Sequence, residues 1–241
     1  MIFDSAFWPR PRFVTGGGDA LVALEVCGDF PAPMPTDFAV DGLKISVATN
    51  DFARFGEAES EMLRVSSPSA APAIEAAPQI VSIRGIVPDP PDLEYLRRSL
   101  GFIYDLLQNG GVGVIDPQTL QVFSPAQWEN TFWSGAFEPT SHATILLSPE
   151  ADKIWLHTRG MRLFGRPDVS CHGVRAAEVE KLQPVFNGLI RMQAAGALIP
   201  DGQIVQAVGI ENRLICRPRG SLDDPDFDNF HLELEWEGAR L

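Results

Sequence analysis

The chain has 241 residues, and 45% of them are hydrophobic, which is enough to bury one large core or two small ones without a metal or disulfide. Its 19 lysines and arginines stand against 32 aspartates and glutamates, a formal net charge of -13 at pH 7. This charge repels phosphate backbones and anionic headgroups, so it argues against nucleic acid and membrane partners and favours a basic protein.

Cysteine usage and the N-terminus indicate a reducing compartment. Cys27, Cys171 and Cys216 are odd in number and far apart, which is unlike a disulfide framework. Residues 1–13, MIFDSAFWPRPRF, lack the regions of a signal peptide because an aspartate and two prolines interrupt them. No apolar run approaches the roughly 20 residues that cross a bilayer. We therefore expect a soluble, cytoplasmic protein.

Residues 1–64 are predicted to form a mainly β segment. Two stretches rich in Val, Leu and Ile, 13–30 and 43–50, are strand candidates, and the proline-rich stretch between them is a loop. The three glycines at 16–18 are expected in a hairpin, because no Lys-Ser/Thr follows them as in a phosphate-binding loop. Residues 65–79, VSSPSAAPAIEAAPQ, have few large side chains and are predicted to be a linker or a long surface loop.

A β-α-β unit is predicted next. Residues 79–87 have the pattern of a buried strand, and in the helix that follows Asp89 is the expected N-cap and apolar residues recur every three or four positions up to Leu107. Asn109-Gly110 ends that helix, and 111–116 is the next strand. The two strands can be parallel, either as neighbours or on the two sides of a third strand.

The C-terminal half alternates helices and strands. A helix is expected at 125–137 with Trp128, Phe132 and Trp133 on one face, and a hairpin at 142–158. The helix 176–195 is expected to kink or restart at Pro184. Strands are predicted at 203–210, 212–218 and 231–237.

Together these elements predict an α+β fold, with mixed β-sheets and a few packed helices. Residues 79–195 suit a ferredoxin-like β-α-β-β unit. Residues 80–241 are expected to form one α+β domain, either separate from the N-terminal segment or in one globule with it.

The stretch HTRGMRLFGRPDVSCH, residues 157–172, concentrates reactive side chains. On a strand, Trp155, His157 and Arg159 share one face. If that face lines a cavity, His157 can transfer a proton and Arg159 can hold an anion. The alternative is an exposed hairpin edge that merely carries them.

The turn FGRPD supplies two further candidates, Arg166 and Asp168. Gly165 permits a tight turn and Asp168 can accept hydrogen bonds from local amides, so Arg166 is expected to pair with Asp168 or to point outward. Loops also carry function, so both residues remain candidate binding residues, with a small anionic ligand at Arg159 and Arg166.

Cysteine chemistry and metal sites are weakly supported. Cys171 and His172 are neighbours, which on a strand places them on opposite faces, although Cys171 and His157 could meet across a hairpin. The chain has no zinc motif, and His142, His157 and His172 form a site only if the hairpin gathers them. The acidic stretch 224–235 has the register of a calcium loop but lacks its glycine and its helices, so we expect a solvated turn. No metal and no cofactor are predicted.

One resemblance extends this interpretation. WLHTRGMRLFGRPD, residues 155–168, together with GVGVIDPQTLQVFSPAQW, residues 111–128, resembles an uncharacterised bacterial family, a domain of unknown function. Its members carry a Trp-Thr/His-x-Gly segment that leads into Phe-Gly-Arg-Pro-Asp/Glu. The resemblance does not cover the first 60 residues. It implies a cytosolic bacterial α+β domain and supplies no catalytic residue.

Three functions follow as hypotheses. The first is a non-enzymatic binding protein of the adaptor or toxin-neutralising kind, suggested by the acidic charge and the lack of a catalytic motif. The second is a small-molecule enzyme or ligand sensor with a pocket at Trp155, His157 and Arg159, closed by the aromatic helix at Trp128 and Trp133. The third is a structural role, for which an exposed apolar patch without a pocket is expected. The sequence leaves the oligomeric state open.

Overall fold

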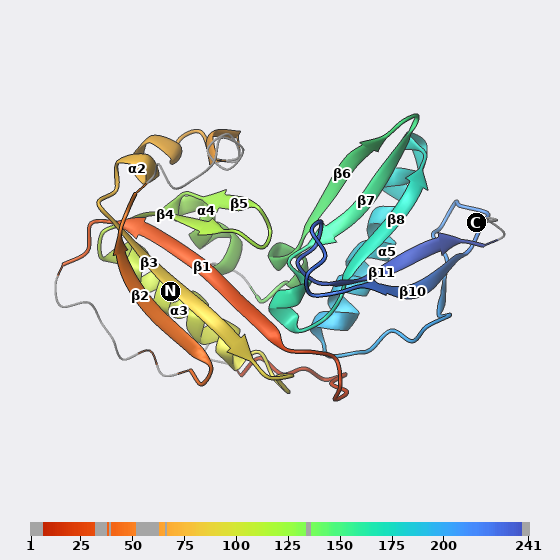
Figure 1. Ribbon diagram of the computed structural model, residues 1–241, viewed down its shortest axis with the longest axis horizontal. Coiled ribbons are helices and arrows are strands. Elements are labelled where there is room, and N and C mark those ends of the chain that lie inside the picture. Colours follow the sequence, from red (N-terminus) through yellow and green to blue (C-terminus); the bar gives the residue numbers. More distant parts are fainter. Residues whose placement is uncertain are drawn as a thin grey trace. The chain divides into compact units, whose positions relative to one another are not determined.

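The computed structural model describes residues 7–31, 38, 40–51, 63–65, 67–133 and 136–237. It confirms an α+β fold with two sheets and a few helices (Figure 1). The chain divides into two compact units. The first contains Met1–Pro9, Leu21–Pro88 and Asp92–Phe137, and the second contains Arg10–Ala20, Asp89–Pro91 and Glu138–Leu241. No described helix is long and apolar enough to cross a membrane.

The first unit is built on a five-stranded sheet in the order β2-β3-β1-β4-β5. These strands are β1 (Ala20–Gly28), β2 (Leu43–Thr49), β3 (Gln79–Val87), β4 (Gly111–Asp116) and β5 (Gln121–Phe123). β3 and β4 lie on the two sides of β1, one of the two arrangements that the sequence left open. Helix α2 (Ala71–Ala76) falls inside the predicted linker 65–79, and its Ile74 is fully buried in the core of this unit. Residues 65–79 therefore lie inside the first unit, whose last residue is Phe137.

Helix α3 (Glu94–Gln108) begins later than predicted. Its N-cap is Leu93, and Asp89 lies outside the helix with a positive φ of 22°. The two prolines that follow Asp89 delay the start, and Asp92 Oδ1 instead accepts from Glu94 N at 3.0 Å. The C-terminal end is as predicted, with Asn109 as C-cap and Gly110 at a φ of 110°.

The aromatic helix is short and belongs to the first unit. Ser124 and Gln127 form a capping box at the start of α4 (Pro125–Trp128), and the π-helical turn η2 (Glu129–Trp133) continues it. Trp128 is buried, and Trp133 stacks on Tyr104 of α3 with ring centroids 4.0 Å apart. The predicted residues 134–135 of this helix lie outside the described residues, as do residues 32–37 and 39 of the predicted proline-rich loop.

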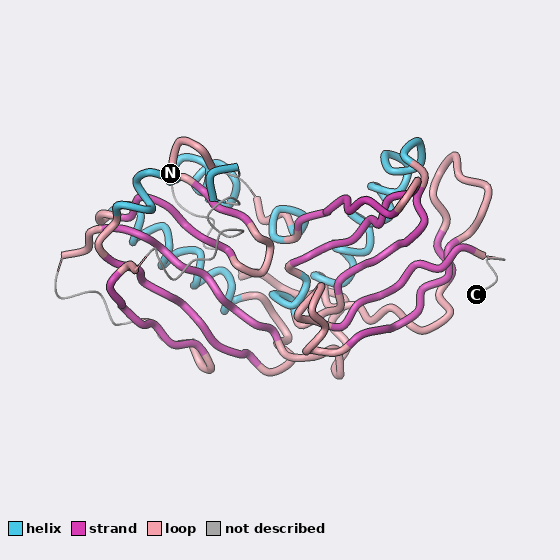
Figure 2. Tube along the Cα trace, turned by 45° about the horizontal axis from the view of Figure 1, so that its top comes forward, coloured by secondary structure: helices cyan, strands magenta, loops and turns pink. Residues whose placement is uncertain are grey.

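The second unit is built on a six-stranded sheet in the order β6-β7-β8-β11-β10-β9 (Figure 2). Its strands are β6 (Thr144–Glu150), β7 (Lys153–Arg159), β8 (Asp168–Val174), β9 (Ile204–Val205), β10 (Leu214–Gly220) and β11 (Phe230–Trp236). β8 and β11 pair parallel, and the other neighbours pair antiparallel. The short helices η3 (Pro139–His142) and η4 (Met161–Phe164) precede β6 and β8.

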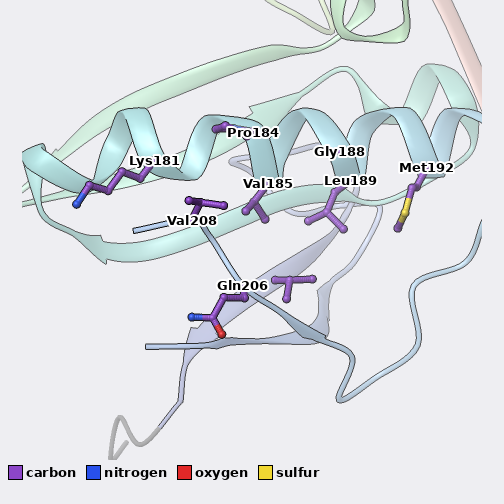
Figure 3. A pocket seen from close by; sticks show the side chains of 9 residues that line it. Lys181, Pro184, Val185, Gly188, Leu189, Met192, Gln206 and Val208 are labelled. Atoms are coloured by element: carbon purple, nitrogen blue, oxygen red, sulfur yellow. The ribbon is translucent and has the colours of Figure 1, made fainter. Parts of the chain in front are cut away.

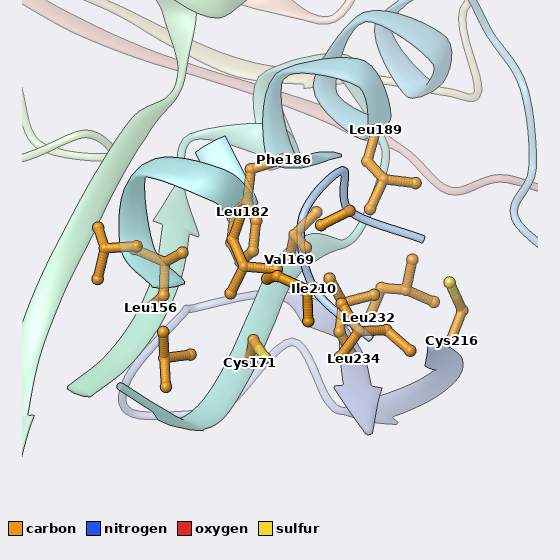
Figure 4. Close-up of a cluster of buried hydrophobic side chains, with 14 residues drawn as sticks. Leu156, Val169, Cys171, Leu182, Phe186, Leu189, Ile210, Cys216, Leu232 and Leu234 are labelled. Atoms are coloured by element: carbon orange, nitrogen blue, oxygen red, sulfur yellow. The ribbon is translucent and has the colours of Figure 1, made fainter. Parts of the chain in front are cut away.

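Helix α5 (Ala176–Ala194) supplies one wall of the second unit's core. Its Leu182, Phe186 and Leu189 face side chains from β8, β10 and β11 (Figure 4). The five apolar positions predicted for the core side of this helix, Val179, Leu182, Phe186, Leu189 and Ile190, are all buried. The helix does not restart at Pro184.

A ferredoxin-like unit over 79–195 is not formed. β3, β4 and β5 belong to the first sheet, whereas β6, β7 and β8 belong to the second. The strands of residues 79–195 resemble that fold in local order alone, because sheet membership depends on pairings between distant segments.

Residues 10–20 belong to the second unit although they precede β1. Arg12 N donates to Ala195 O at 2.8 Å, and Val14 N donates to Gly196 O at 3.1 Å. The buried Arg10 donates through Nε to Ala194 O at 3.0 Å. These bonds fasten the segment to the C-terminal end of α5, so it does not form the strand predicted from residue 13.

Candidate functional site

The predicted residues of β7 lie on the sheet face opposite α5. Leu156 packs in the core, so Trp155 and His157 on either side of it project to the other face. Their rings stack with centroids 3.8 Å apart, and the ring of His172 stacks on Trp155 at 5.0 Å. Trp155 Nε1 also donates to Ser170 Oγ at 2.9 Å. Trp155 and His157 therefore share one face of the sheet, where their rings pack on one another and on the ring of His172.

His157 is covered on this face. It is 4% exposed, and the ring of Phe227 meets it edge-on with centroids 5.7 Å apart. Burial lowers the pKa of His157, so it is neutral at pH 7. Its Nδ1 has no hydrogen-bond partner among the described residues. A neutral imidazole packed between two aromatic rings does not present a proton to a substrate.

The acidic segment 221–229 is a turn whose Asp223, Asp226 and Asp228 are exposed, as predicted, and its Phe227 packs over the same face. Phe227, which is buried, stacks on His231 with centroids 4.5 Å apart. Arg159 donates to the carbonyl of Asp226 and pairs with Asp228 Oδ2 at 3.3 Å, and Arg162 donates to Asp228 O at 2.6 Å. Arg159 thus holds its own chain's loop rather than facing an open site.

Asp168 organises the turn before β8. Its Oδ1 accepts from Thr158 Oγ1 at 2.8 Å and from Met161 N at 3.2 Å, and its Oδ2 accepts from Asn229 Nδ2 at 2.8 Å. Burial raises the pKa of this carboxyl to about 6, and the hydrogen bonds from Asn229, Thr158 and Met161 oppose that rise. The predicted hydrogen bond from a local backbone amide to Asp168 is present. Through its three hydrogen bonds the Asp168 carboxylate joins β7, η4 and the 221–229 segment.

Arg166 neither pairs with Asp168 nor points outward. Its side chain is 0% exposed. It donates to the carbonyls of Gly165 at 2.8 Å and Gly196 at 2.9 Å, and it pairs with Asp89 Oδ1 at 3.3 Å. The expectation failed because Asp89 and Gly196 are remote in sequence, and only Gly165 is a neighbour. Because its donors are taken by the protein's own oxygens, Arg166 fastens residues 10–20 and 89–91 to the rest of the second unit.

The cysteine and metal alternatives gain no support. Cys171 packs in the core opposite Leu156, whereas His157 and the exposed His172 lie on the other face. Burial raises the pKa of the Cys171 thiol far above its ordinary value. His142 is buried against Phe164 in edge-to-face contact at 6.1 Å. Within the described ranges no group of three or more His, Cys, Asp or Glu side chains can hold a metal.

A cavity of about 450 Å³ lies elsewhere, along the outer side of α5 (Figure 3). We call it the α5 trough. Six of its lining residues come from one stripe of the helix and three from the segment that contains β9: Lys181, Pro184, Val185, Gly188, Leu189 and Met192, then Val205, Gln206 and Val208. The volume falls within the range of roughly 300–1,000 Å³ that ligand sites occupy.

Two lining residues disfavour the helix that carries them. Proline inside a helix removes a backbone hydrogen bond and costs about 3 kcal/mol, and glycine costs about 1 kcal/mol relative to alanine. Pro184 and Gly188 both stand inside α5 and both line the trough. A Cβ at Gly188 would meet no atom within 4 Å, so a larger residue fits there without a clash. Both residues therefore oppose the local helix propensity at positions that line the trough.

The trough is lined mainly by apolar side chains, and its polar residues are Lys181 and Gln206. Val185 and Leu189 project from α5 toward the segment that carries Gln206 (Figure 3). Val185, Met192 and Val205 pack against the core cluster beneath. Lys181 lies at one end, where its Nζ donates to Gly209 O at 3.0 Å. It also lines a second, more polar cavity of about 610 Å³ with Glu178 and Glu211.

Sequence reasoning missed this site. The apolar periodicity of residues 176–195 predicts the core stripe alone, and Pro184 predicts a kink or a restart. The available signal was a second stripe on the same helix, at positions 181, 184, 185, 188 and 192, that combines apolar residues with two helix-breaking ones.

Comparison with known proteins gives no relative: no protein-family model, no curated protein and no solved structure matches the chain. The resemblance of residues 111–128 and 155–168 to a bacterial family therefore stays a prediction.

Proposed function

We propose that this protein is a non-catalytic binding protein that holds an apolar helical segment of a basic partner protein in the α5 trough. The placement of Pro184 and Gly188 carries the proposal, because both cost helix stability, both line the same apolar surface, and the missing side chain of Gly188 leaves open space there. A role of the adaptor or toxin-neutralising kind fits such a surface.

The shape and charge of the trough favour a protein segment over a small molecule. From Lys181 to Met192 the trough follows three turns of α5, which is longer than the roughly two turns over which an amphipathic helix places anchors at i, i+3, i+4 and i+7. Val208 on its wall is 93% exposed, so apolar surface extends to the rim, where a small ligand would not cover it. The net charge of -13 attracts a basic partner.

The same residues do not favour catalysis. Lys181 is the one titratable side chain that lines the trough, and its ammonium is bonded to a carbonyl of its own chain. General acid–base chemistry needs a proton donor and an acceptor within reach of one substrate. His157, the other candidate, is enclosed by rings.

Calorimetric titration with a helical peptide of leucine and lysine, whose leucines occupy one face, tests the proposal. A peptide of the same composition with its leucines spread around the helix is the control for charge alone. The wild type is expected to bind the amphipathic peptide more tightly than the control peptide. Gly188→Leu fills the trough and is expected to weaken binding at least about tenfold, since a lost apolar anchor is worth about 1.5–3 kcal/mol.

Gly101→Leu is the matched control variant. Gly101 lies inside α3 of the first unit, and a Cβ there also meets no atom within 4 Å. It is expected to bind the peptide like the wild type. Equal affinity of the wild type and Gly188→Leu for the amphipathic peptide would refute the proposed function.

A further inference from the structure

The four edges of the two sheets in the described ranges are protected to different degrees. An edge strand exposes unpaired backbone groups, and proteins usually shorten it, bulge it or place proline and charge on it. β5 has three residues and β9 has two, while β6 has seven but contains Pro149 and Glu150. β2, LKISVAT, also has seven residues, without proline, and it pairs with β3 in unbroken register. Lys44 is the one charged residue in it.

The free side of β2 can be assigned from the bonds at its ends. Ile86 N donates to Gly42 O at 3.2 Å and Asn50 N donates to Pro78 O at 2.9 Å, and these bonds continue the β2–β3 register by one residue at each end. In an antiparallel pair, bonded and non-bonded positions alternate. Lys44, Ser46 and Ala48 therefore direct their backbone groups toward β3. Ile45, Val47 and Thr49 direct theirs to the open edge. Leu43 also faces that edge, but its N–H already donates to Val40 O at 3.1 Å, so only its carbonyl can pair there.

This edge is accessible. Every residue from Ser46 to Thr49 is exposed, and the side chain of Val47 is 46% exposed. Among the described residues β3 is the one strand that pairs with β2. A seven-residue strand with β-branched residues, one charge and no proline is a template for another strand.

We propose that β2 pairs antiparallel with β2 of a second copy of this chain about a two-fold axis at Ser46. This register places Ile45 opposite Val47 of the second copy, and Val47 opposite its Ile45, so the outward donors and acceptors of these residues bond in pairs. Leu43 stands opposite Thr49. A shift of the axis to Ile45 leaves Thr49 without a partner in the second β2, and a shift to Val47 leaves Leu43 without one.

The charges of β2 are compatible with this pairing. At the non-bonded positions next to the axis, Lys44 of one copy stands opposite Ala48 of the other, so the two lysines do not face each other. Side chains at such positions approach closely, with Cβ atoms about 4.5–5.5 Å apart. A charge introduced at Ala48 therefore reports on the register: Ala48→Glu places a carboxylate opposite Lys44 twice, and Ala48→Lys places an ammonium there twice.

Sedimentation velocity of the full chain, from about 1 µM to about 1 mM, tests the proposal over the range of weak to moderate self-association. The wild type is expected to shift from monomer to dimer, with no larger species. The dimer dissociation constant of Ala48→Lys is expected to exceed that of Ala48→Glu at least about tenfold. Added salt should reduce the ratio of the two constants, because it screens the charges.

Val47→Pro distinguishes the loss of edge pairing from the loss of folding. It removes an outward N–H, a position where an edge strand tolerates proline, and keeps the bonds to β3. It is expected to stay monomeric with an unchanged circular dichroism spectrum, while Val47→Thr dimerises. The proposal is overturned if the wild type stays monomeric over the whole concentration range. That result is also expected if β2 pairs with a different protein. A dimer that responds equally to both charges at position 48 also overturns the proposal.

Discussion

Arg166→Met removes the buried cation that holds the two N-terminal segments of the second unit. The guanidinium donates to four carbonyls, of Gly165, Gly196, Val14 and Ala197, at 2.8 to 3.3 Å and pairs with Asp89. Breaking a buried charge pair costs about 3–5 kcal/mol, and buried carbonyls left without donors add to that cost. We expect the free energy of unfolding to fall by about 4 kcal/mol, a large part of the roughly 5–15 kcal/mol of a typical domain.

Urea unfolding at pH 7, followed by circular dichroism, measures this loss. Arg166→Lys should lose less, because an ammonium keeps the charge and up to three donors. Arg162→Met is the control, since Arg162 donates to the one carbonyl of Asp228 at 2.6 Å and should cost under about 1 kcal/mol. Gly17→Ala is also expected to lower the free energy of unfolding, because the added Cβ would overlap the Arg166 guanidinium. If Arg166→Met costs no more than the control, the proposed anchoring role is refuted.

Three further predictions concern buried titratable groups. The pKa of Asp168, about 6, lies above its value in the unfolded chain, so its contribution to stability is complete below about pH 4 and is lost as pH rises through 6. In urea unfolding at a series of pH values, Asp168→Asn should remove up to about 3 kcal/mol of that pH dependence. Burial lowers the pKa of His142 to about 3, so the contribution of the neutral ring to folding stability is present above pH 6.5 and is lost as pH falls. His142→Gln should therefore lose less free energy of unfolding between pH 7 and pH 4 than the wild type does. An equal loss in both proteins would contradict this. Cys27, Cys171 and Cys216 are buried, and burial raises the pKa of Cys216 to about 11, so a thiol reagent at pH 8 should label them only after unfolding; rapid labelling of the native protein would contradict their placement.

Local patterns predicted the elements well because they encode which face of an element is buried. The apolar periodicity of α5 marked its core stripe, and the β-rich run at 79–87 matches β3. The capping box at Ser124 and the turn at Gly110 also follow from local chemistry. These features depend on residues within a few positions of each other.

Long-range organisation could not be predicted in the same way. The insertion of β1 between β3 and β4, and the attachment of residues 10–20 to α5, depend on partners that are remote in sequence. Arg166 illustrates the limit: its residue type and turn suggested a local pair or an exposed ligand, whereas its partners come from residues 14, 89, 196 and 197. A buried arginine cannot be told from a surface one by local pattern alone.

The candidate site was visible only in part. The stretch 157–172 attracted attention because it is rich in reactive residue types, and the structure uses several of them to build a turn and a stack of rings. The α5 trough draws instead on residues with little chemical reactivity, whose common feature is position on one side of a helix. Binding surfaces of this kind become apparent when the second wall, here Val205 to Val208, is in place.

Methyl NMR of the wild type titrated with the amphipathic leucine–lysine peptide tests the central claim most directly. The claim predicts that the methyl signals of Met192, Val185 and Val205 in the trough shift together and saturate with one peptide per chain, while those of Val169 in the core remain in place. Shifts that are absent from the trough, or that centre on the ring face of Trp155 and His157, would contradict the account.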